Sequence, residues 1–200
     1  MGRCYYISIE HNIIQMNPVN ASNTISGSDY GIHTLVVYED LTILREFYSQ
    51  YVKKGIEEKK EVIQLAPFYE TKVSVRIVLS KGNVSLDIEK LEKAEKSLII
   101  VDSLKKYIGN VSPDFDYNYN KKLVEHAKAM GKSGVSIIAD KGTFPFKQRI
   151  DDLINFELSL PSKYDIDLKR ICVYHQKDFS RVSEEKRLKL LNHHMVAVKI

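Results

Sequence analysis

The chain has 200 residues, of which 44% are hydrophobic and 28% are charged, and its formal net charge is +4. This composition predicts one globular domain with a sizeable core, and the weak charge, whose lysines mostly stand beside glutamates, argues against direct nucleic-acid binding. Two cysteines are too few for a disulfide framework, and the lack of a long apolar run or an apolar signal core predicts a cytoplasmic protein with no membrane partner.

The first 30 residues are predicted to be an addition to a main domain of residues 31–200. Residues 4–9, Cys-Tyr-Tyr-Ile-Ser-Ile, indicate a short strand. The Asn, Pro, Ser and Gly residues of 17–29 indicate a polar, turn-rich linker. The addition is therefore either an extra edge strand or a loosely docked arm.

In the main domain, apolar runs alternate with apolar residues at helical spacing. Strands are predicted at 33–38, 61–67, 97–101, 135–139, 169–174 and 195–200, with an edge strand at 84–88. Helices are predicted at 41–55, 73–81, 121–130, 146–160 and 183–191, with partial helix at 88–96. Because such alternation is typical of right-handed βαβ units, we expect a three-layer α/β/α fold with a mainly parallel sheet.

The segment 98–101, Leu-Ile-Ile-Val, is apolar at every position. This pattern is typical of a strand covered on both faces, so we place it at the centre of the sheet, flanked by 35–37 and 135–139. Asp102 follows it directly, and an acidic residue at this edge either holds magnesium, as in RecA-class nucleoside triphosphatases, or caps the next turn. The polar and aromatic stretch 110–120 is predicted to be a long loop, serving as a lid or as a cover for a sheet edge.

A phosphate-binding loop would follow the first main strand, and it needs glycines whose backbone amides approach the phosphates. That place holds Tyr38-Glu39-Asp40-Leu41, which contains no glycine and two carboxylates. Gly131-Lys132-Ser133 resembles the end of such a loop but leaves a helix and enters a strand, so it is read as a helix C-cap. We therefore expect no ATP hydrolysis and no catalytic residues.

Thiolate and imidazole ligands suit zinc, and Cys172, His175, His193 and His194 supply both kinds. Because Cys172 and His175 lie three apart on a predicted strand, they point to opposite faces until the strand ends. We interpret Cys172 as a core residue and these histidines as surface residues. No metal and no other cofactor is predicted.

Several short motifs resemble the MEDS domain, the sensory domain of methanogen and methylotroph signalling proteins and of dichloromethane-responsive regulators. They are the strand from His33 to Tyr38 with Glu39-Asp40, the segments 54–57 and 61–65, and the tail Cys172-Val-Tyr174, Phe179 and Leu191-Asn-His193. The resemblance covers residues 30–200 and implies a RecA- and KaiC-like fold without a phosphate loop. It also implies a non-catalytic sensor of small hydrocarbon derivatives, with His33, Tyr38, Cys172, Tyr174 and His193 matching the family pattern.

MEDS domains commonly accompany a kinase or DNA-binding module, and no region outside the predicted sheet is long enough for one. The output partner is therefore expected to be a second copy of the chain or a separate signalling protein. The alternative function is a divergent RecA- or KaiC-like ATPase, or a regulatory subunit of one.

The ligand site is predicted at the carboxyl edge of the sheet, where the strand ends of a doubly wound fold converge. The residues expected there are Tyr38, Glu39, Phe68, Asp102, Ser103, Asp140, Tyr174 and His175. These residues predict a pocket with aromatic walls and a few carboxylates, suited to a small, partly apolar or cationic molecule. His33 begins its strand and is expected at the opposite edge in a structural role. The alternative is that helices and the 110–120 loop fill this edge and leave no cavity.

Overall fold

The computed structural model describes residues 13–107 and 112–200. The strands of this part of the chain form one sheet of seven, in the order β1-β7-β2-β6-β5-β3-β4, with every neighbouring pair parallel. Their bounds are β1 Ile14–Gln15, β2 His33–Tyr38, β3 Val62–Ala66, β4 Leu98–Ile100, β5 Val135–Asp140, β6 Leu168–His175 and β7 Val196–Lys199.

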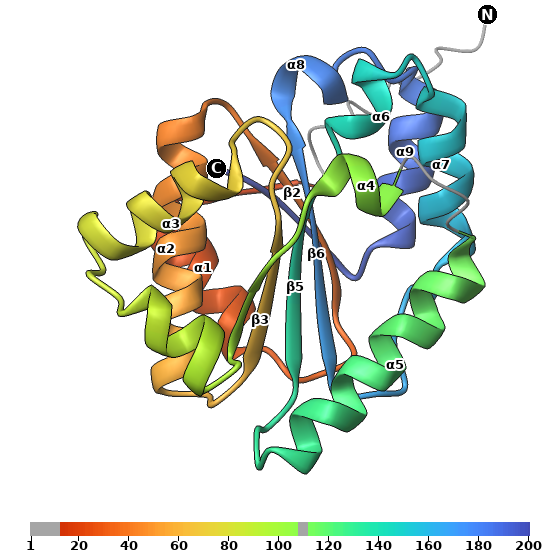
Figure 1. Cartoon of the computed structure of the whole chain (residues 1–200). Coiled ribbons are helices and arrows are strands. Elements are labelled where there is room, and N and C mark those ends of the chain that lie inside the picture. The colour runs from red at the N-terminus through yellow and green to blue at the C-terminus, as the bar shows by residue number, and fades with distance from the viewer. Residues whose placement is uncertain (1–12, 108–111) are drawn as a thin grey trace, which may run out of the picture.

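Helices cover both faces of the sheet, which confirms the three-layer α/β/α fold (Figure 1). One face carries α1 (Pro18–Gly27), α2 (Leu41–Glu57), α3 (Lys72–Lys81) and the π-helical turn η2 (Lys90–Ala94), and the other carries α5 (Pro113–Ala129), α7 (Ile150–Ser159) and α9 (Glu184–His193). The short helices α4 (Ser103–Tyr107), α6 (Thr143–Phe146) and α8 (Gln176–Phe179) lie toward the carboxyl edge. No helix in the described ranges is long and apolar enough to cross a membrane.

Two hydrophobic cores lie on the two faces of the sheet because side chains alternate along each strand. From β2, Val36 and Tyr38 face the helices α1 to α3, whereas Leu35 and Val37 face α7 and α9. All six residues of β2 are buried, as expected for a strand covered on both faces.

The predicted central position of 98–101 is wrong. Strand β4 is at the end of the sheet and pairs, among the described residues, with β3 alone, while β6 is central between β2 and β5. Leu98 and Ile100 belong to one core, and Ile99 and Val101 pack against the other. An edge strand covered on both faces therefore has the same continuous apolar sequence as a central strand.

The predicted linker at 17–29 is largely helix α1. The Asn17 side chain accepts a hydrogen bond from the Asn20 N–H at 2.8 Å, Pro18 opens the first turn, and Ala21 and Ile25 are buried. Its Asn, Ser and Thr residues have low helix propensity, so packing on α2 decides the structure here. The strand predicted at 4–9 lies outside the described residues.

Three further expectations are corrected. The segment 84–88 forms no strand: it is irregular up to Asp87, and Ile88 begins a helical turn, while Val84, Leu86 and Ile88 are buried in the core on the α3 side. The described part of the predicted 110–120 loop is the start of α5, where Ser112 accepts the Phe115 N–H. The predicted helix 146–160 begins only at Ile150 of α7, because α6 ends at Phe146 and Gln148, at a φ of 56°, interrupts the helical path.

Candidate functional site

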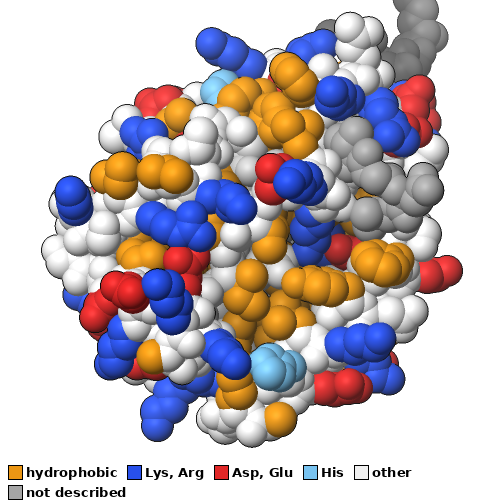
Figure 2. Space-filling view, in the orientation of Figure 1, with side chains coloured by type: hydrophobic (Ala, Val, Ile, Leu, Met, Phe, Trp, Pro, Cys, Tyr) orange, Lys and Arg blue, Asp and Glu red, His pale blue; other side chains and the backbone are white. Residues whose placement is uncertain are grey.

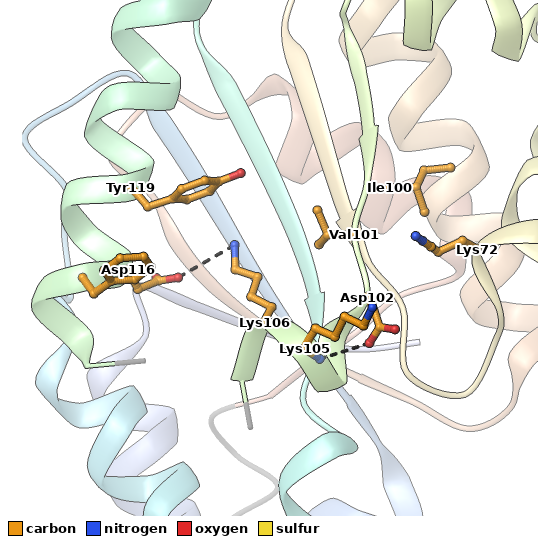
Figure 3. A pocket seen from close by; sticks show the side chains of 9 residues that line it. Lys72, Ile100, Val101, Asp102, Lys105, Lys106, Asp116 and Tyr119 are labelled. Carbon is orange, nitrogen blue, oxygen red and sulfur yellow. Dashed lines mark hydrogen bonds and ion pairs between the residues drawn. The ribbon is translucent and has the colours of Figure 1, made fainter. Parts of the chain in front are cut away.

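A cavity of about 450 Å³ lies between the end of β4, helix α4 and the first half of α5 (Figure 3). Hydrophobic and basic side chains border a hollow on this face of the molecule (Figure 2). The lining residues are Lys72, Ile100, Val101, Asp102, Lys105, Lys106, Phe115, Asp116 and Tyr119. Its size is that of a small-molecule site.

Lys106 is the most buried cation of the cavity wall. Its Nζ lies 3.8 Å from Asp116 Oδ1 and 4.9 Å from the centre of the Tyr119 ring. Burial lowers the pKa of Lys106 to about 8, although Asp116 opposes the shift. This amine is therefore a hydrogen-bond donor with little hydration to lose when a ligand binds.

Asp116 connects the cavity to the centre of the sheet. It contacts the fully buried Arg170 of β6 through Nη1 at 2.5 Å and accepts a hydrogen bond from the Asn120 amide at 3.1 Å. Burial alone would raise the pKa of Asp116, but Arg170 and Lys106 hold it below its usual value. The carboxylate is therefore ionised and neutralised by Arg170.

Asp102 lies between this cavity and a second hollow of about 350 Å³. Phe68, Asp102 and Ser103 line the second hollow. Asp102 Oδ1 accepts the Lys105 N–H at 3.1 Å, so it caps the first turn of α4, as one of the two predictions for it stated. Ser103 is buried and shares a hydrogen bond of 3.0 Å with Thr143. Three of the eight predicted site residues thus lie beside a cavity at the outer margin of the carboxyl edge.

At the centre of this edge, Tyr38 and Asp140 bind each other. The Tyr38 hydroxyl donates to Asp140 Oδ2 at 2.8 Å, and the Gly142 N–H donates to Oδ1 at 2.9 Å. Burial raises the pKa of Asp140 to about 7 even though both hydrogen bonds favour the ionised form. Burial also raises the pKa of Tyr38, with Asp140 adding to the shift.

The rings that follow β3 fill the crevice around this pair. A side chain at Gly142 would meet the rings of Phe68 and Tyr69 at 2.5 and 2.6 Å, and the Tyr69 hydroxyl binds Asp178. The His175 ring packs 5.2 Å from Tyr38 and 5.3 Å from Tyr69. About 20 Å³ of space remains, enough for one water molecule. The predicted residues therefore do not form one shared pocket.

The two other predicted residues lie apart from both hollows. Glu39 is exposed and pairs with Lys199 at 3.2 Å. Tyr174 is buried on the opposite face, with its ring 5.6 Å from that of Phe179.

No protein-family model and no curated protein sequence matches the chain. Its structure matches that of a KaiC-like protein from the hyperthermophilic archaeon Pyrococcus horikoshii OT3, with a TM-score of 0.52 over 73% of this chain. The two sequences are 18% identical over the match, so the comparison concerns the fold. The chain has a KaiC-like fold of the RecA type. It spans 62% of the length of the KaiC-like protein that it matches.

The turn after β2 is where a phosphate-binding loop would follow the first main strand. In this chain Asp40 Oδ1 accepts the N–H groups of Thr42 and Ile43 at 2.7 and 3.0 Å, so a carboxylate already occupies the N-terminus of α2. The strand-end aspartate beside this position is Asp140, which touches Tyr38, whereas Asp102 follows the edge strand. Asp140 is therefore the strand-end carboxylate that contacts the end of β2.

The residues that match the family pattern fall into two groups. His33, Cys172 and His193 lie together beneath α7 and α9, with the His33 and His193 rings 5.8 Å apart. Tyr38 and Tyr174 lie toward the carboxyl ends of β2 and β6. His33 lies at the start of β2, as predicted, and Cys172 is buried. His194 is buried as well, which corrects its expected surface position.

Sequence reasoning missed Lys106, Lys141, Glu157 and Arg170, all charged residues at positions that the structure buries or nearly buries. For two of these residues, Arg170 and Glu157, the sequence contains a pattern that could have indicated burial. Arg170 interrupts an apolar strand on the face shared by Leu168 and Cys172, and Glu157 lies three residues after the inward-facing Ile154 of α7.

Proposed function

We propose that this chain is a non-catalytic sensory domain of the KaiC-like fold and that a small, partly apolar molecule binds in the cavity between β4, α4 and α5. The resemblance to MEDS domains supports sensing of a hydrocarbon derivative. The output partner in this proposal is a second copy of the chain or a separate signalling protein.

The observation that carries the proposal is the arrangement after β2. Asp40 already binds the amides at the N-terminus of α2, and Tyr38 closes over Asp140. A triphosphate at this place would meet a carboxylate in place of free backbone amides, and a magnesium ion would have to displace the Tyr38 hydroxyl. Both features disfavour the alternative function as an ATPase.

The charges around the cavity favour an anionic ligand over the cationic one considered from the sequence. Three lysines line it, Lys72, Lys105 and Lys106, against the two carboxylates of Asp102 and Asp116. Of these two, Asp116 is neutralised by Arg170. Apolar surface comes from β4 and from the rings of Phe115 and Tyr119. A small carboxylic acid with an apolar body is the hydrocarbon derivative that best satisfies both features.

Calorimetric titration with benzoate tests the proposal, with benzyl alcohol as the uncharged probe. We expect benzoate to bind more tightly than the alcohol, and Lys106→Met to weaken benzoate binding by about tenfold or more, since a charge-assisted hydrogen bond is lost. Lys122→Met, on the exposed side of the same helix as Tyr119, is the matched control and should bind benzoate like the wild type.

Magnesium-ATP is the probe that tests the alternative function as an ATPase. Phosphate release by the wild type that is abolished by Asp140→Asn or Asp102→Asn would establish the ATPase alternative. Equal binding of benzoate by the wild type and Lys106→Met would move the ligand site away from this cavity.

A further inference from the structure

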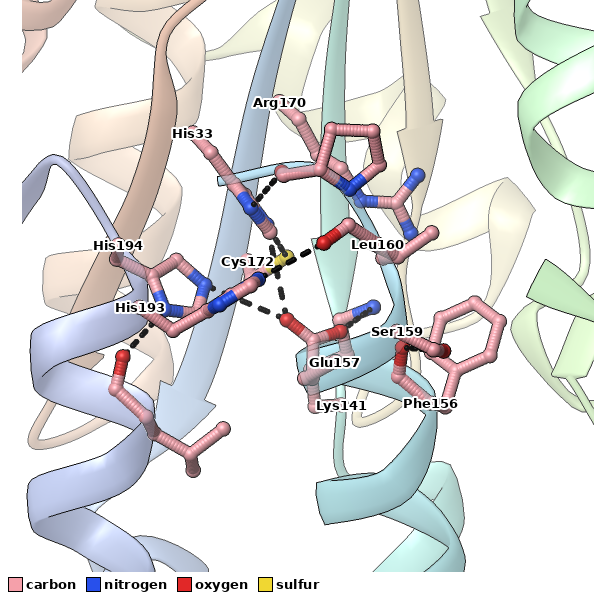
Figure 4. Close-up of polar contacts among 12 residues, drawn as sticks. His33, Lys141, Phe156, Glu157, Ser159, Leu160, Arg170, Cys172, His193 and His194 are labelled. Atoms are coloured by element: carbon pink, nitrogen blue, oxygen red, sulfur yellow. Dashed lines mark hydrogen bonds and ion pairs between the residues drawn. The ribbon is translucent and has the colours of Figure 1, made fainter. Parts of the chain in front are cut away.

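Four side chains of the kinds that ligate metal ions converge on the buried face of β2 and β6 (Figure 4). They are His33 at the start of β2, Cys172 of β6, Glu157 of α7 and His194, which follows α9. All four are buried, and one ligand atom of each lies within 4.8 Å of the other three. They come from four separate elements, so the tertiary fold alone brings them together.

Both imidazole rings are fixed by backbone carbonyls. His33 Nδ1 lies 3.0 Å from the Pro161 oxygen, and His194 Nδ1 lies 2.7 Å from the Leu190 oxygen. Because a carbonyl oxygen only accepts, each Nδ1 carries the hydrogen and donates it. Nε2 of each ring is then the atom that faces the cluster, which is the arrangement that orients histidine ligands in metal sites.

The distances within the cluster approach those of a tetrahedral metal site. His33 Nε2 lies 3.4 Å from Cys172 Sγ and 3.7 Å from Glu157 Oε2, and His194 Nε2 lies 3.3 Å from the same oxygen. Ligand atoms around a tetrahedral Zn²⁺ ion are about 3.3–3.8 Å apart, given metal–ligand distances of about 2.0–2.3 Å.

The cluster also holds polar atoms that the described protein does not satisfy. The contact between His194 Nε2 and Glu157 Oε2 lacks hydrogen-bond geometry, and neither atom has another hydrogen-bond partner among residues 13–107 and 112–200. Glu157 Oε1 faces Lys141 Nζ at 2.7 Å, so the carboxylate is held with Oε2 turned toward the histidines. Buried polar atoms without partners are costly, and a bound ion would satisfy both.

We propose that His33, Glu157, Cys172 and His194 form a zinc site. One thiolate, two imidazoles and one carboxylate are a ligand set that zinc accepts, and four protein ligands leave no open position, so the site is structural. Binding releases the Cys172 thiol proton, and the thiolate and the carboxylate balance the two charges of the ion. The ion would tie β2 and β6 to α7 and to the residue after α9. This inference does not depend on the ligand cavity.

The rival arrangement is free of metal: His194 and Glu157 share a proton, and the Cys172 thiol donates to His33 Nε2. Cobalt substitution distinguishes the metal site from the metal-free arrangement, because only a thiolate ligand gives a sulfur-to-cobalt charge-transfer band. We expect the purified chain to hold about one zinc ion, and the cobalt form to show this band together with intense tetrahedral ligand-field bands.

Variants assign the ligands. Cys172→Ser should abolish the sulfur-to-cobalt band, and both Cys172→Ser and His194→Gln should weaken metal binding by about 100-fold or more. Cys4→Ser and His175→Gln are the matched controls and should keep the band and the metal. A wild type that binds no more zinc or cobalt than Cys172→Ser would overturn the proposal.

If Cys172→Ser fails to fold, X-ray absorption at the zinc edge of the folded wild type decides without a variant. One sulfur scatterer at about 2.3 Å with nitrogen and oxygen scatterers at about 2.0–2.2 Å is expected. A first shell without sulfur, or a chain that stays free of metal after refolding with zinc, would contradict the site.

Discussion

The buried side chains on the two faces of the sheet differ in polarity and charge. Beneath α1, α2 and α3 the core is mostly apolar, and its buried charged groups are Asp140 and the ion pair of Lys169 with Glu61. Lys169 Nζ also donates to the Ser26 carbonyl, and the Ser136 hydroxyl donates to Glu61. Beneath α5, α7 and α9 the buried groups include Arg170, Lys141, Glu157, His33 and Asp116. Among the described residues, Arg170 Nε and Nη2 and Lys106 Nζ have no hydrogen-bond partner there.

This difference indicates where function is located. Apolar burial of the first kind stabilises the fold at no desolvation cost, whereas unsatisfied buried charges destabilise it and persist where they serve a site. The 450 Å³ cavity opens on the charged face, and the four-ligand cluster lies under the same face. The following substitutions test the contrast.

The largest effect is expected from Asp116→Ala, which leaves Arg170 buried without its partner. We expect a loss of about 3–5 kcal/mol in the free energy of unfolding, measured by urea denaturation. The double variant Asp116→Leu with Arg170→Met should recover most of that loss, because it removes both charges. Asp114→Ala, an exposed position of the same helix, should change stability by less than about 0.5 kcal/mol. A single variant as stable as the wild type would show that Arg170 finds another partner.

Asp140 should give the chain a pH-dependent stability. Its pKa rises from 3.8 in the unfolded chain to about 7 in the folded one, so the folded chain binds more protons throughout that interval. The free energy of unfolding therefore falls as pH rises, by about 4 kcal/mol in all, and levels off above pH 7. Asp140→Asn should remove this slope, while Asp114→Asn should keep it. Identical slopes for the wild type and Asp140→Asn would refute the assignment.

Away from Asp140, the face beneath α1, α2 and α3 should respond only to lost volume. Leu79→Ala removes a fully buried side chain of α3, and we expect a loss of about 3 kcal/mol with no dependence on pH between 5 and 8. Ile77→Ala, on the exposed side of the same helix, should cost less than about 0.5 kcal/mol. Comparable losses for the two variants would mean that α3 does not pack as described.

The sequence predicted the α/β/α layers well because strand and helix periodicities are local. It did not predict the order of the strands, since β4 is covered on both faces at the sheet edge and looks like a central strand. The sequence predicted that Asp102 lies at the carboxyl edge of the sheet, where it lines a cavity. It could not show that Tyr38 and Asp140 bind each other. Pairings such as Asp116 with Arg170, 54 residues apart, depend on the register of whole elements and leave no short-range pattern.

Methyl NMR of the wild-type chain tests most directly where the ligand binds. Ile100 and Val101 report on the cavity, and Ile138 and Val173 line the small space beside Tyr38 and Asp140. Addition of benzoate should shift the Ile100 and Val101 methyl signals and leave those of Ile138 and Val173 in place, and magnesium-ATP should shift neither pair. Shifts of Ile138 and Val173 with magnesium-ATP, without any change at Ile100 and Val101, would contradict the account.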